Sequence, residues 1–441
     1  MFVVVRLIII PYNQNSVRNI MEHYSVIIFL LAVMIGLSAI AEKIKLPYPI
    51  IMIVAGIAIG YIPSVPTVEL DPEIIFLIFL PPLIYDAAFN IPFKEFRTNF
   101  NTITTLAISL VFITATGIAI LAHYIIPGMT WPLAFVLGSI LSATDAVSAI
   151  SITKGLGLSH KTTTILEGES LINDASALVS YRFSLLAAGG TSVVLWKASL
   201  NFVFVLAGGF LVGVIIGKMM AFIIARVHHN RMATIGFMLL MPFVAYRVAE
   251  EIHVSGVIAV VVLGLSIARF SAKVFPDDLK TQSKTIWEVI LFLLNGFIFI
   301  LIGLQFPYVV RTMHVDQLLI YTGYGILITI VAFILRMARV FLQQINLERA
   351  VKAKKGRVTK DALLDFKSCM IITWSGMRGI ISLTTAIALP VSLTNGSAFP
   401  QRNAILFLSV VVVLITIVGQ GLTLPWLVKK LKGNEIENTS H

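Results

Sequence analysis

Apolar segments of about 20 residues recur from one end of the chain to the other, and this pattern determines the fold class. A helix needs about 20 residues to cross the roughly 30 Å of hydrocarbon in a bilayer. Hydrophobic residues make up 58% of the 441 residues and charged residues 12%, whereas soluble domains have about 45–50% and about 25%. The mean hydropathy is +0.93. We therefore predict an all-α, polytopic membrane protein.

The apolar segments predict about thirteen transmembrane helices joined by short connections. Their approximate ranges are 24–41, 48–62, 73–89, 102–126, 132–153, 162–187, 199–225, 232–249, 254–270, 285–306, 317–341, 364–389 and 404–428. The transmembrane domain then covers 24–431, without an inserted soluble domain. Residues 1–23 form an N-terminal extension, in which Met21 is a possible start, and 432–441 form a short cytoplasmic tail. An arm at the membrane surface is the alternative for the extension.

Lysine and arginine are unequally distributed between the two sets of loops. The set that includes the basic loop 346–361 carries 22 of them, and the other set carries 5. Because cytoplasmic loops are enriched in these residues, we predict that the N-terminus is outside and the C-terminus is cytoplasmic. The net charge of +11 then reflects contact with anionic lipids. We expect no nucleic-acid partner, since the sequence contains no soluble basic module.

The sixth apolar segment contains three carboxylates and one amide. A charged side chain at the centre of a bilayer costs roughly 2.5–3.5 kcal/mol on insertion scales, so such residues usually have a function. Residues three or four apart share a helix face, which places Glu167, Ser170 and Asp174 on one stripe and Glu169 and Asn173 on another. Polar contacts between helices would explain Asn173 or Ser170 alone. They do not explain Asp174 together with Glu169, so we predict a functional site around Asp174.

The fifth segment contains a second carboxylate within a cluster of small and hydroxylated residues. Irregular backbone at membrane depth is tolerated where it is buried in protein or lines a cavity, and transporters direct such interrupted helices at the bound ion. We predict a break over 143–146, at which Thr144 offers its carbonyl oxygen and Asp145 its carboxylate. Close helix packing would explain Gly138 and Ser139, but it leaves Asp145 unexplained.

The twelfth segment is predicted to contain a second break, because Gly376 and Gly379 bracket Arg378 near its middle. Segments five and twelve are seven apart. That offset is expected if segments 1–6 and 8–13 are inverted repeats, each with one broken helix, linked by the seventh segment. We therefore expect the two broken helices to cross.

Arg182, Arg336 and Arg378 lie well inside apolar segments, and Arg339 lies near the end of one. A buried carboxylate is tolerated when it is paired and hydrogen-bonded, and we expect Glu169 to be the paired acid. Two interpretations stay open for Arg182, a residue of the ion pathway or a side chain that extends to the membrane interface. Asp86 ends the third segment on the cytoplasmic side. It marks a possible pathway together with Glu167, and a solvated helix end is its alternative.

Several other functions lack their sequence signals. The phosphate-binding pattern GxxxxGK[ST] and the metal-binding pattern HExxH are both missing, and Cys369 is the single cysteine of the chain. We therefore expect neither an enzyme nor a bound cofactor. A cation channel, with the same carboxylates as a selectivity ring, is the alternative from another class. The two predicted breaks and the lack of a carbonyl-filter pattern make it the weaker interpretation.

Four motifs together resemble the monovalent cation/proton antiporter-1 family, the sodium/proton exchangers, in its bacterial NhaP-like branch. In chain order they are Phe79-Leu-Pro-Pro82, Thr144-Asp145, Glu167-Gly-Glu-Ser-Leu-Ile-Asn-Asp-Ala175 and Gly376-Met-Arg-Gly379. The resemblance extends over about 24–431. It implies exchange of Na⁺ or Li⁺ for H⁺ by alternating access, and it also implies a homodimer in the cell membrane. Exchange of K⁺ for H⁺ stays open, because a set of oxygen ligands does not define the ion radius.

The resemblance also implies roles for the polar residues of the fifth and sixth segments. Asp174 would exchange the cation and the proton. Asp145, Ser170 and the Thr144 carbonyl would complete the coordination of Na⁺. Asn173 occupies the position of an aspartate in electrogenic relatives, which implies electroneutral exchange.

Two further residues receive structural roles from the resemblance. It implies a buried ion pair between Glu169 and an arginine of the eleventh segment, which Arg336 fits, and it implies that Arg378 stabilises the crossing of the twelfth segment. The chain departs from the family at Ala146, where a proline commonly follows the aspartate. The break must therefore form here without proline.

Overall fold

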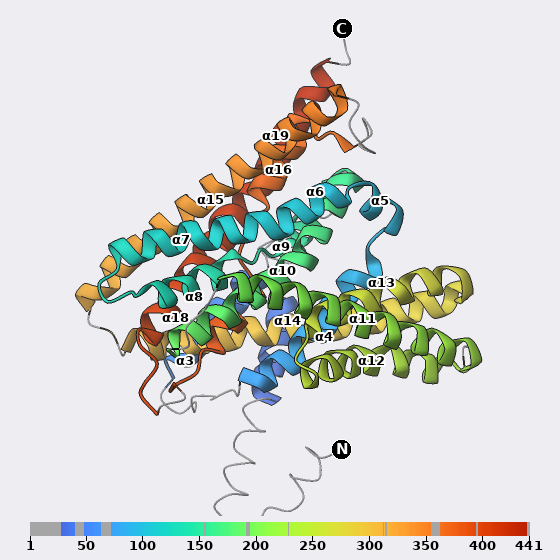
Figure 1. The fold of residues 1–441 in the computed structure, drawn as a ribbon, viewed down its shortest axis with the longest axis horizontal. Coiled ribbons are helices and arrows are strands. Elements are labelled where there is room, and N and C mark those ends of the chain that lie inside the picture. Colours follow the sequence, from blue (N-terminus) through green and yellow to red (C-terminus); the bar gives the residue numbers. More distant parts are fainter. Residues whose placement is uncertain are drawn as a thin grey trace, which may run out of the picture. The chain divides into compact units, whose positions relative to one another are not determined.

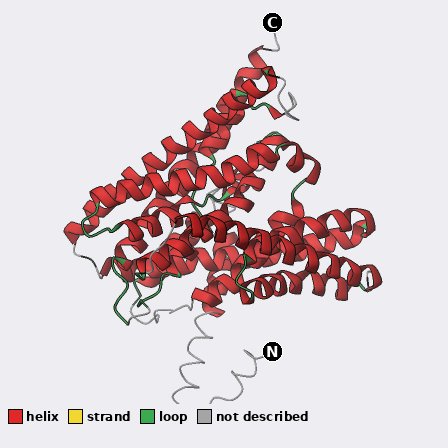
Figure 2. Ribbon diagram, viewed as in Figure 1, coloured by secondary structure: helices red, strands yellow, loops and turns green. Residues whose placement is uncertain are grey.

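A computed structural model describes residues 28–39, 48–62, 72–153, 156–190, 195–227, 229–311, 313, 315–353, 362–393 and 396–438. The predicted N-terminal extension, including Met21, lies outside these residues, and the predicted tail is described as far as Asn438. The described residues are almost entirely helical, with one isolated β-bridge between Ser392 and Ala398 (Figure 2). The all-α prediction is confirmed.

Helices occupy every segment that was predicted to span the membrane, as far as these segments are described. They are Ile28–Ala39, α3 (Tyr48–Gly60), α4 (Pro72–Asn90), α5 (Phe93–Thr98), α6 (Phe100–Thr104), the π-helix η1 (Thr105–Leu110), α7 (Val111–Ile125), α8 (Trp131–Ser142), α9 (Ala146–Ile152), α10 (His160–Ala188), α11 (Leu195–Val227), α12 (Arg231–Glu251), α13 (Gly256–Val274), α14 (Asp277–Arg311), α15 (Val315–Lys352), α16 (Phe366–Trp374), α17 (Ile380–Ile387), α18 (Arg402–Ile415), the π-helix η3 (Thr416–Gln420) and α19 (Gly421–Asn438). Within the described part, seven helices are long and apolar enough to cross a membrane. The count of thirteen crossings therefore stays a prediction.

The chain divides into two compact units. The first consists of Met1–Glu69 and Asn295–Tyr308, and the second of Leu70–Leu294 and Val309–His441. In the first unit, α3 and the second half of α14 approach closely at glycines, because a Cβ at Gly56 would collide with the Ile300 carbonyl oxygen. Small residues permit this kind of close approach between membrane helices. All the predicted site residues belong to the second unit.

Within the second unit, α10 is the helix around which the predicted site is arranged. It packs against α8, α9 and η1, and also against α4 and α13 (Figure 1). Its N-terminus is capped by the Ser159 hydroxyl, which accepts a hydrogen bond from the Thr162 N–H at 3.1 Å. The 16 buried residues of α10 include Glu169, Asn173 and Asp174, so its polar stripe faces protein.

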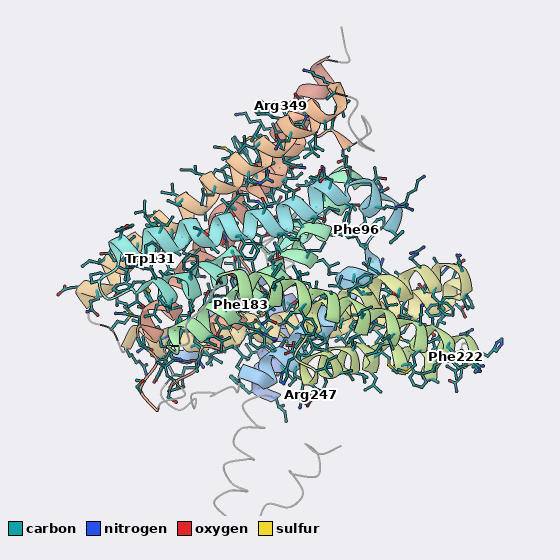
Figure 3. All side chains as sticks on the ribbon, viewed as in Figure 1. Phe96, Trp131, Phe183, Phe222, Arg247 and Arg349 are labelled. Carbon is teal, nitrogen blue, oxygen red and sulfur yellow. The ribbon has the colours of Figure 1, made fainter. Side chains whose placement is uncertain are left out.

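Helix α11 carries large apolar side chains that are exposed in the chain by itself, among them Phe222 (Figure 3). They are Leu200, Val203, Phe204, Phe210, Leu211, Ile215, Met219 and Phe222. A contiguous apolar face of this size is unfavourable in water and suits the acyl chains of a bilayer. This face supports the membrane assignment made from the sequence.

Both predicted breaks are present. Helix α8 ends at Ser142 and α9 begins at Ala146, with non-helical residues 143–145 between them. Helix α16 ends at Trp374 and α17 begins at Ile380, after the irregular residues 375–379. Asp145 starts α9, since its carboxylate accepts the N–H of Ser148, as expected of an aspartate at an N-cap. The arrangement of the two halves as inverted repeats stays a prediction.

Candidate ion-binding site

The two breaks contact each other through their main chains. The Asp145 N–H donates a hydrogen bond to the Met377 carbonyl oxygen at 2.8 Å. The Ser382 hydroxyl donates to the Ala143 carbonyl oxygen at 3.4 Å. A main-chain N–H and a carbonyl group of the first break are therefore satisfied by groups of the other interrupted helix. The two interrupted helices form one crossing, as the sequence predicted.

Arg378 binds the helix ends that meet at this crossing. Its side chain is 1% exposed, its Nε donates to the Leu141 carbonyl oxygen at 3.0 Å, and its Nη1 donates to the Gly376 carbonyl oxygen at 2.7 Å. Helix C-termini carry partial negative charge, which a guanidinium compensates at α8 and α16. Its main-chain N–H donates to the Thr416 hydroxyl of η3 at 3.2 Å. The hydrogen-bond partners of Arg378 are thus groups of the crossing, while Arg336 pairs with Glu169.

Asp145 lies where α9 begins and beside the start of α17. Its Oδ1 accepts the Ser148 N–H at 3.1 Å, and its Oδ2 accepts the Ser148 hydroxyl at 2.6 Å. A Cβ at Gly379 would collide with the Asp145 carboxylate, so a larger residue at position 379 would have to displace that carboxylate. Asp145 is partly exposed. Its carboxylate is therefore held by both broken helices while retaining contact with solvent.

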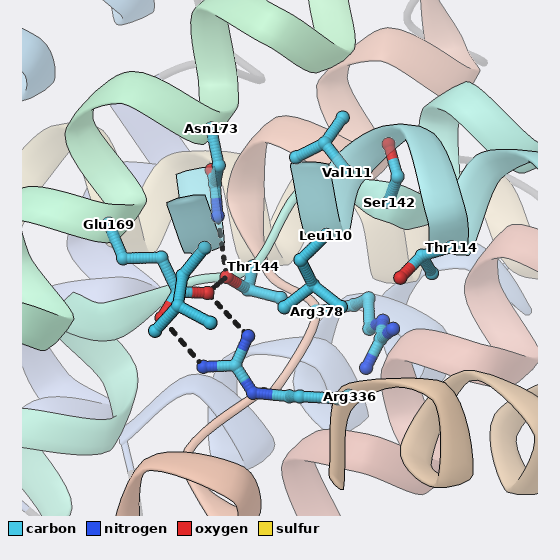
Figure 4. Close-up of a pocket in the computed structure, with 10 residues that line it drawn as sticks. Leu110, Val111, Thr114, Ser142, Thr144, Glu169, Asn173, Arg336 and Arg378 are labelled. Atoms are coloured by element: carbon cyan, nitrogen blue, oxygen red, sulfur yellow. Dashed lines mark hydrogen bonds and ion pairs between the residues drawn. The ribbon is translucent and has the colours of Figure 1, made fainter. Parts of the chain in front are cut away.

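Glu169 and Arg336 form a buried, bidentate ion pair (Figure 4). Arg336 Nη1 binds Glu169 Oε1, and Arg336 Nη2 donates to Glu169 Oε2 at 2.9 Å. Both side chains are 2% exposed. Arg336 Nε also donates to the Ile372 carbonyl oxygen at 3.1 Å, and a Cβ at Gly376 would collide with the Arg336 side chain. The structure thus places Arg336 of α15 opposite Glu169, where the resemblance implied it.

Thr144 joins the first break to α10. Its carbonyl oxygen accepts the Ser170 hydroxyl at 3.0 Å. Its hydroxyl accepts a hydrogen bond from the Asn173 Nδ2 group at 2.6 Å (Figure 4). The same hydroxyl lies 3.4 Å from Glu169 Oε1, to which it donates. Asn173 Oδ1 is buried and has no hydrogen-bond partner. The predicted ligand atoms of Thr144 and Ser170 are therefore in direct contact.

Asp174 lies next to these groups on α10 and is 7% exposed. Its charge interacts with those of Asp145 and Glu169. Within this cluster, the Glu169 carboxylate is neutralised by Arg336. Carboxylate, hydroxyl and carbonyl oxygens are the ligands that hard cations prefer. The cluster has the chemistry of a site for an alkali cation or a proton.

A narrow pocket borders the cluster on the side of the ion pair (Figure 4). It is lined by Leu106, Leu110, Val111, Thr114, Ser142, Thr144, Glu169, Asn173, Arg336 and Arg378. Neither Asp145 nor Asp174 belongs to this lining, whereas Thr144, Glu169 and Asn173 do.

The three predicted pathway residues lie in two places. Glu167 of α10 is close enough to Asp86 of α4 for their charges to interact, and Asp86 accepts a hydrogen bond from Asn90 at 2.9 Å. Arg182, near the other end of α10, pairs with Glu250 at 2.7 Å. The structure brings Asp86 and Glu167 together and leaves Arg182 apart from them.

The sequence reasoning missed Ser148, the Met377 carbonyl oxygen and Thr416. The spacing Asp145–Ser148 is that of an N-cap and the third residue of its helix, a signal that could have indicated Ser148. Thr416 begins the π-helix η3, and π-helical turns often occur at functional sites. Nothing in the local sequence of α18 and η3 predicted this turn.

A helical membrane bundle in which two interrupted helices cross beside buried carboxylates is typical of secondary transporters. The chain belongs to the family described as sodium/hydrogen exchanger, transmembrane, whose family model matches residues 28–430. This confirms the family that the motifs had indicated. The family consists of membrane transporters and not of enzymes.

Two curated relatives resemble the chain over most of its length. It is 34% identical to a "Sodium, potassium, lithium and rubidium/H(+) antiporter" of Bacillus pumilus over 93% of this chain. The chain spans 62% of that relative's length. It is also 30% identical to the "Na(+)/H(+) antiporter NhaH" of Halobacillus aidingensis, over 92% of this chain and 97% of the relative.

A solved structure has the same fold. The sodium proton antiporter MjNhaP1 of Methanocaldococcus jannaschii superposes with a TM-score of 0.70 at 19% sequence identity. The match covers 91% of this chain and 99% of MjNhaP1. The likeness confirms the predicted fold class.

Proposed function

We propose that the chain is a secondary antiporter, which exchanges Na⁺ or Li⁺ for H⁺ across the cell membrane at Asp145 and Asp174. The observation that carries this proposal is the oxygen cluster at the helix crossing. It contains the Asp174 carboxylate beside the Asp145 carboxylate, with the Ser170 hydroxyl against the Thr144 carbonyl oxygen. The names of the relatives, which include a Na(+)/H(+) antiporter, agree with this chemistry.

Competition between the cation and the proton for the same site couples their movement. A carboxylate that is removed from water is costly as a bare anion, and either a cation or a proton neutralises it. If only the neutralised site crosses between the inward-facing and outward-facing states, a cation moves one way and a proton moves the other way. The exchange then needs no cofactor, and it follows the gradients of both ions.

Binding of the cation replaces a hydrogen bond within the site. The Ser170 hydroxyl donates to the Thr144 carbonyl oxygen at 3.0 Å, and both oxygens are proposed ligands. The cation would separate them and bind each through a lone pair. Asn173 supports Thr144 from the other side through its Nδ2 group. Because its amide is neutral, we propose that one charge is exchanged for one charge, without a net current.

Exchange of K⁺ for H⁺ is the second candidate. It is favoured by the relative whose name includes potassium and rubidium besides sodium and lithium. The ligand types are the same for all these ions, and the size of the occupied site selects among them. We keep Na⁺ and Li⁺ as the first proposal.

The rest of the transport cycle is proposed on the same basis. Asp86 and Glu167, whose charges interact, would attract cations on the cytoplasmic side, and Arg182 would lie on the outer pathway. The predicted orientation, with the N-terminus outside and the C-terminus cytoplasmic, follows from the positive loops. A homodimer and contacts of the basic loops with anionic lipids complete the proposal.

The experiment uses the full chain in proteoliposomes with a fluorescent pH probe and an imposed pH gradient. Addition of Na⁺ or Li⁺ should dissipate the gradient with a saturable dependence on cation concentration, and a comparison with K⁺ separates the two candidate functions. An imposed membrane voltage should leave the rate unchanged. A cation current without proton movement would instead identify a channel and contradict the proposal.

A further inference from the structure

Ser148 contacts both oxygens of the Asp145 carboxylate. Its main-chain N–H donates to Oδ1 at 3.1 Å, and its hydroxyl donates to Oδ2 at 2.6 Å. Ser148 lies in α9, three residues beyond Asp145, and is 5% exposed. Because two donors of one residue bind two oxygens, they restrict the plane of the carboxylate as well as its position.

The two contacts of Ser148 have different purposes. The bond to Oδ1 satisfies the Ser148 N–H, which would otherwise be unpaired at the start of α9. Alanine at position 148 would supply the same main-chain donor. The hydroxyl is not needed for the cap. It forms a charge-assisted hydrogen bond to the second carboxylate oxygen, and such bonds are about twice as strong as neutral ones. The start of α9 thus depends on the main chain, and the orientation of the carboxylate depends on the hydroxyl.

Contacts from both interrupted helices restrict Asp145, and Ser148 supplies the two to its carboxylate oxygens. The Asp145 main chain is held by its N–H bond to the Met377 carbonyl oxygen at 2.8 Å. The carboxylate also abuts Gly379, where a Cβ would collide with it. A carboxylate has about four lone-pair sites, so it can accept two hydrogen bonds and still bind a cation. The hydroxyl therefore orients the carboxylate without occupying all of its lone pairs.

We propose that Ser148 is a positioning residue of the cation site: its hydroxyl holds the Asp145 carboxylate in the orientation that binds the transported cation. This inference rests on the proposed antiport function. A ligand that is already oriented loses less conformational freedom when the cation binds. Ser148 therefore increases cation affinity without itself touching the cation.

The test compares Ser148→Ala with the wild-type full chain in proteoliposomes. Loss of the hydroxyl should raise the apparent KM for Na⁺ and for Li⁺ about tenfold, since one hydrogen bond to a charged group is lost. The maximal rate should stay within about twofold of the wild type, because the N–H cap of α9 remains. Ser148→Thr retains the hydroxyl and should restore the KM. Ser148→Cys keeps the size with a weak donor and should resemble Ser148→Ala.

Ser409→Ala is the matched control. Ser409 is a fully buried serine of α18 whose hydroxyl donates to a carbonyl oxygen of its own helix, that of Ile405, at 2.7 Å. It should leave the KM unchanged. An unchanged KM in Ser148→Ala, or a lower melting temperature and maximal rate with an unchanged KM, would overturn the positioning role while antiport stands. A wild-type chain that exchanges no cation for protons would overturn the proposed function and this inference together.

Discussion

Helix α10 carries two Glu–Arg ion pairs that differ in their access to water. Glu169 pairs with Arg336 where both side chains are 2% exposed. Near the other end of the helix, Arg182 pairs with Glu250 at 2.7 Å, with side chains that are 49% and 22% exposed. The first pair is bidentate and has a further bond from Arg336 to Ile372. Glutamate and arginine thus form a buried ion pair in one place and a solvent-exposed ion pair in the other.

The difference shows which polar groups near the site are committed to structure. Removing one partner of a buried pair leaves an uncompensated charge and costs about 3–5 kcal/mol, whereas an exposed pair contributes about 0–1 kcal/mol. The buried Glu169–Arg336 pair is therefore costly to break. We propose Asp145 and Asp174 as the acids of the cluster that exchange ions.

The largest effect is expected for Arg336→Met. The substitution leaves the Glu169 carboxylate buried without its cation and should destabilise the protein by about 3–5 kcal/mol. Thermal unfolding of the purified protein in detergent measures this change. The double variant Glu169→Gln with Arg336→Met removes both charges, so it should lose less stability than Arg336→Met alone. If Arg336→Met lowered the free energy of unfolding by less than about 1 kcal/mol, the buried pair would contribute no more than an exposed pair, and the comparison would be contradicted.

An intermediate effect is expected for Thr144→Val. The Thr144 hydroxyl accepts the Asn173 amide at 2.6 Å, and its loss leaves that buried donor unpaired, at a cost of about 1–3 kcal/mol. The carbonyl oxygen that we propose as a ligand remains. Thr144→Ser keeps the hydroxyl and should retain the stability of the wild type. Equal melting temperatures for the valine and serine variants would contradict the role of this bond.

The smallest effect is expected for Arg182→Gln. The exposed pair should contribute less than about 1 kcal/mol, and this contribution should decrease with added salt. Glu250 keeps its bond to the Gly256 N–H at 3.1 Å, so the start of α13 stays capped. Arg247→Gln, in an exposed pair with Glu251 within α12, is the control. A destabilisation above about 2 kcal/mol, insensitive to salt, would place Arg182 with the structural pair.

Much of the fold was predictable from the sequence, because the length of an apolar segment and its interruption by polar residues are local properties of the chain. The breaks at Asp145 and Arg378 were predicted, since a charge flanked by small residues is incompatible with a regular lipid-facing helix. The position of Arg336 opposite Glu169 was suggested by resemblance. Its side-chain chemistry alone did not distinguish it from the other arginines of the apolar segments.

The partners of Arg378 and Asp145 were not predictable in the same way. Arg378 binds the carbonyl oxygens of Leu141 and Gly376, and these acceptors exist only because two helices are broken at one crossing. Pairing rules for charged side chains do not include main-chain carbonyl groups freed by tertiary structure. The bond from the Arg378 N–H to Thr416 depends likewise on the π-helix η3.

The central claim is that the Asp174 carboxylate exchanges the cation and the proton. Its most direct test is Na⁺-driven dissipation of a pH gradient in proteoliposomes that contain equal amounts of the wild-type chain or of Asp174→Asn. The isosteric amide lacks both the negative charge and the titrating proton, so exchange should fall to the level of empty liposomes, while the melting temperature stays close to that of the wild type. Exchange at the wild-type rate by Asp174→Asn would contradict the account.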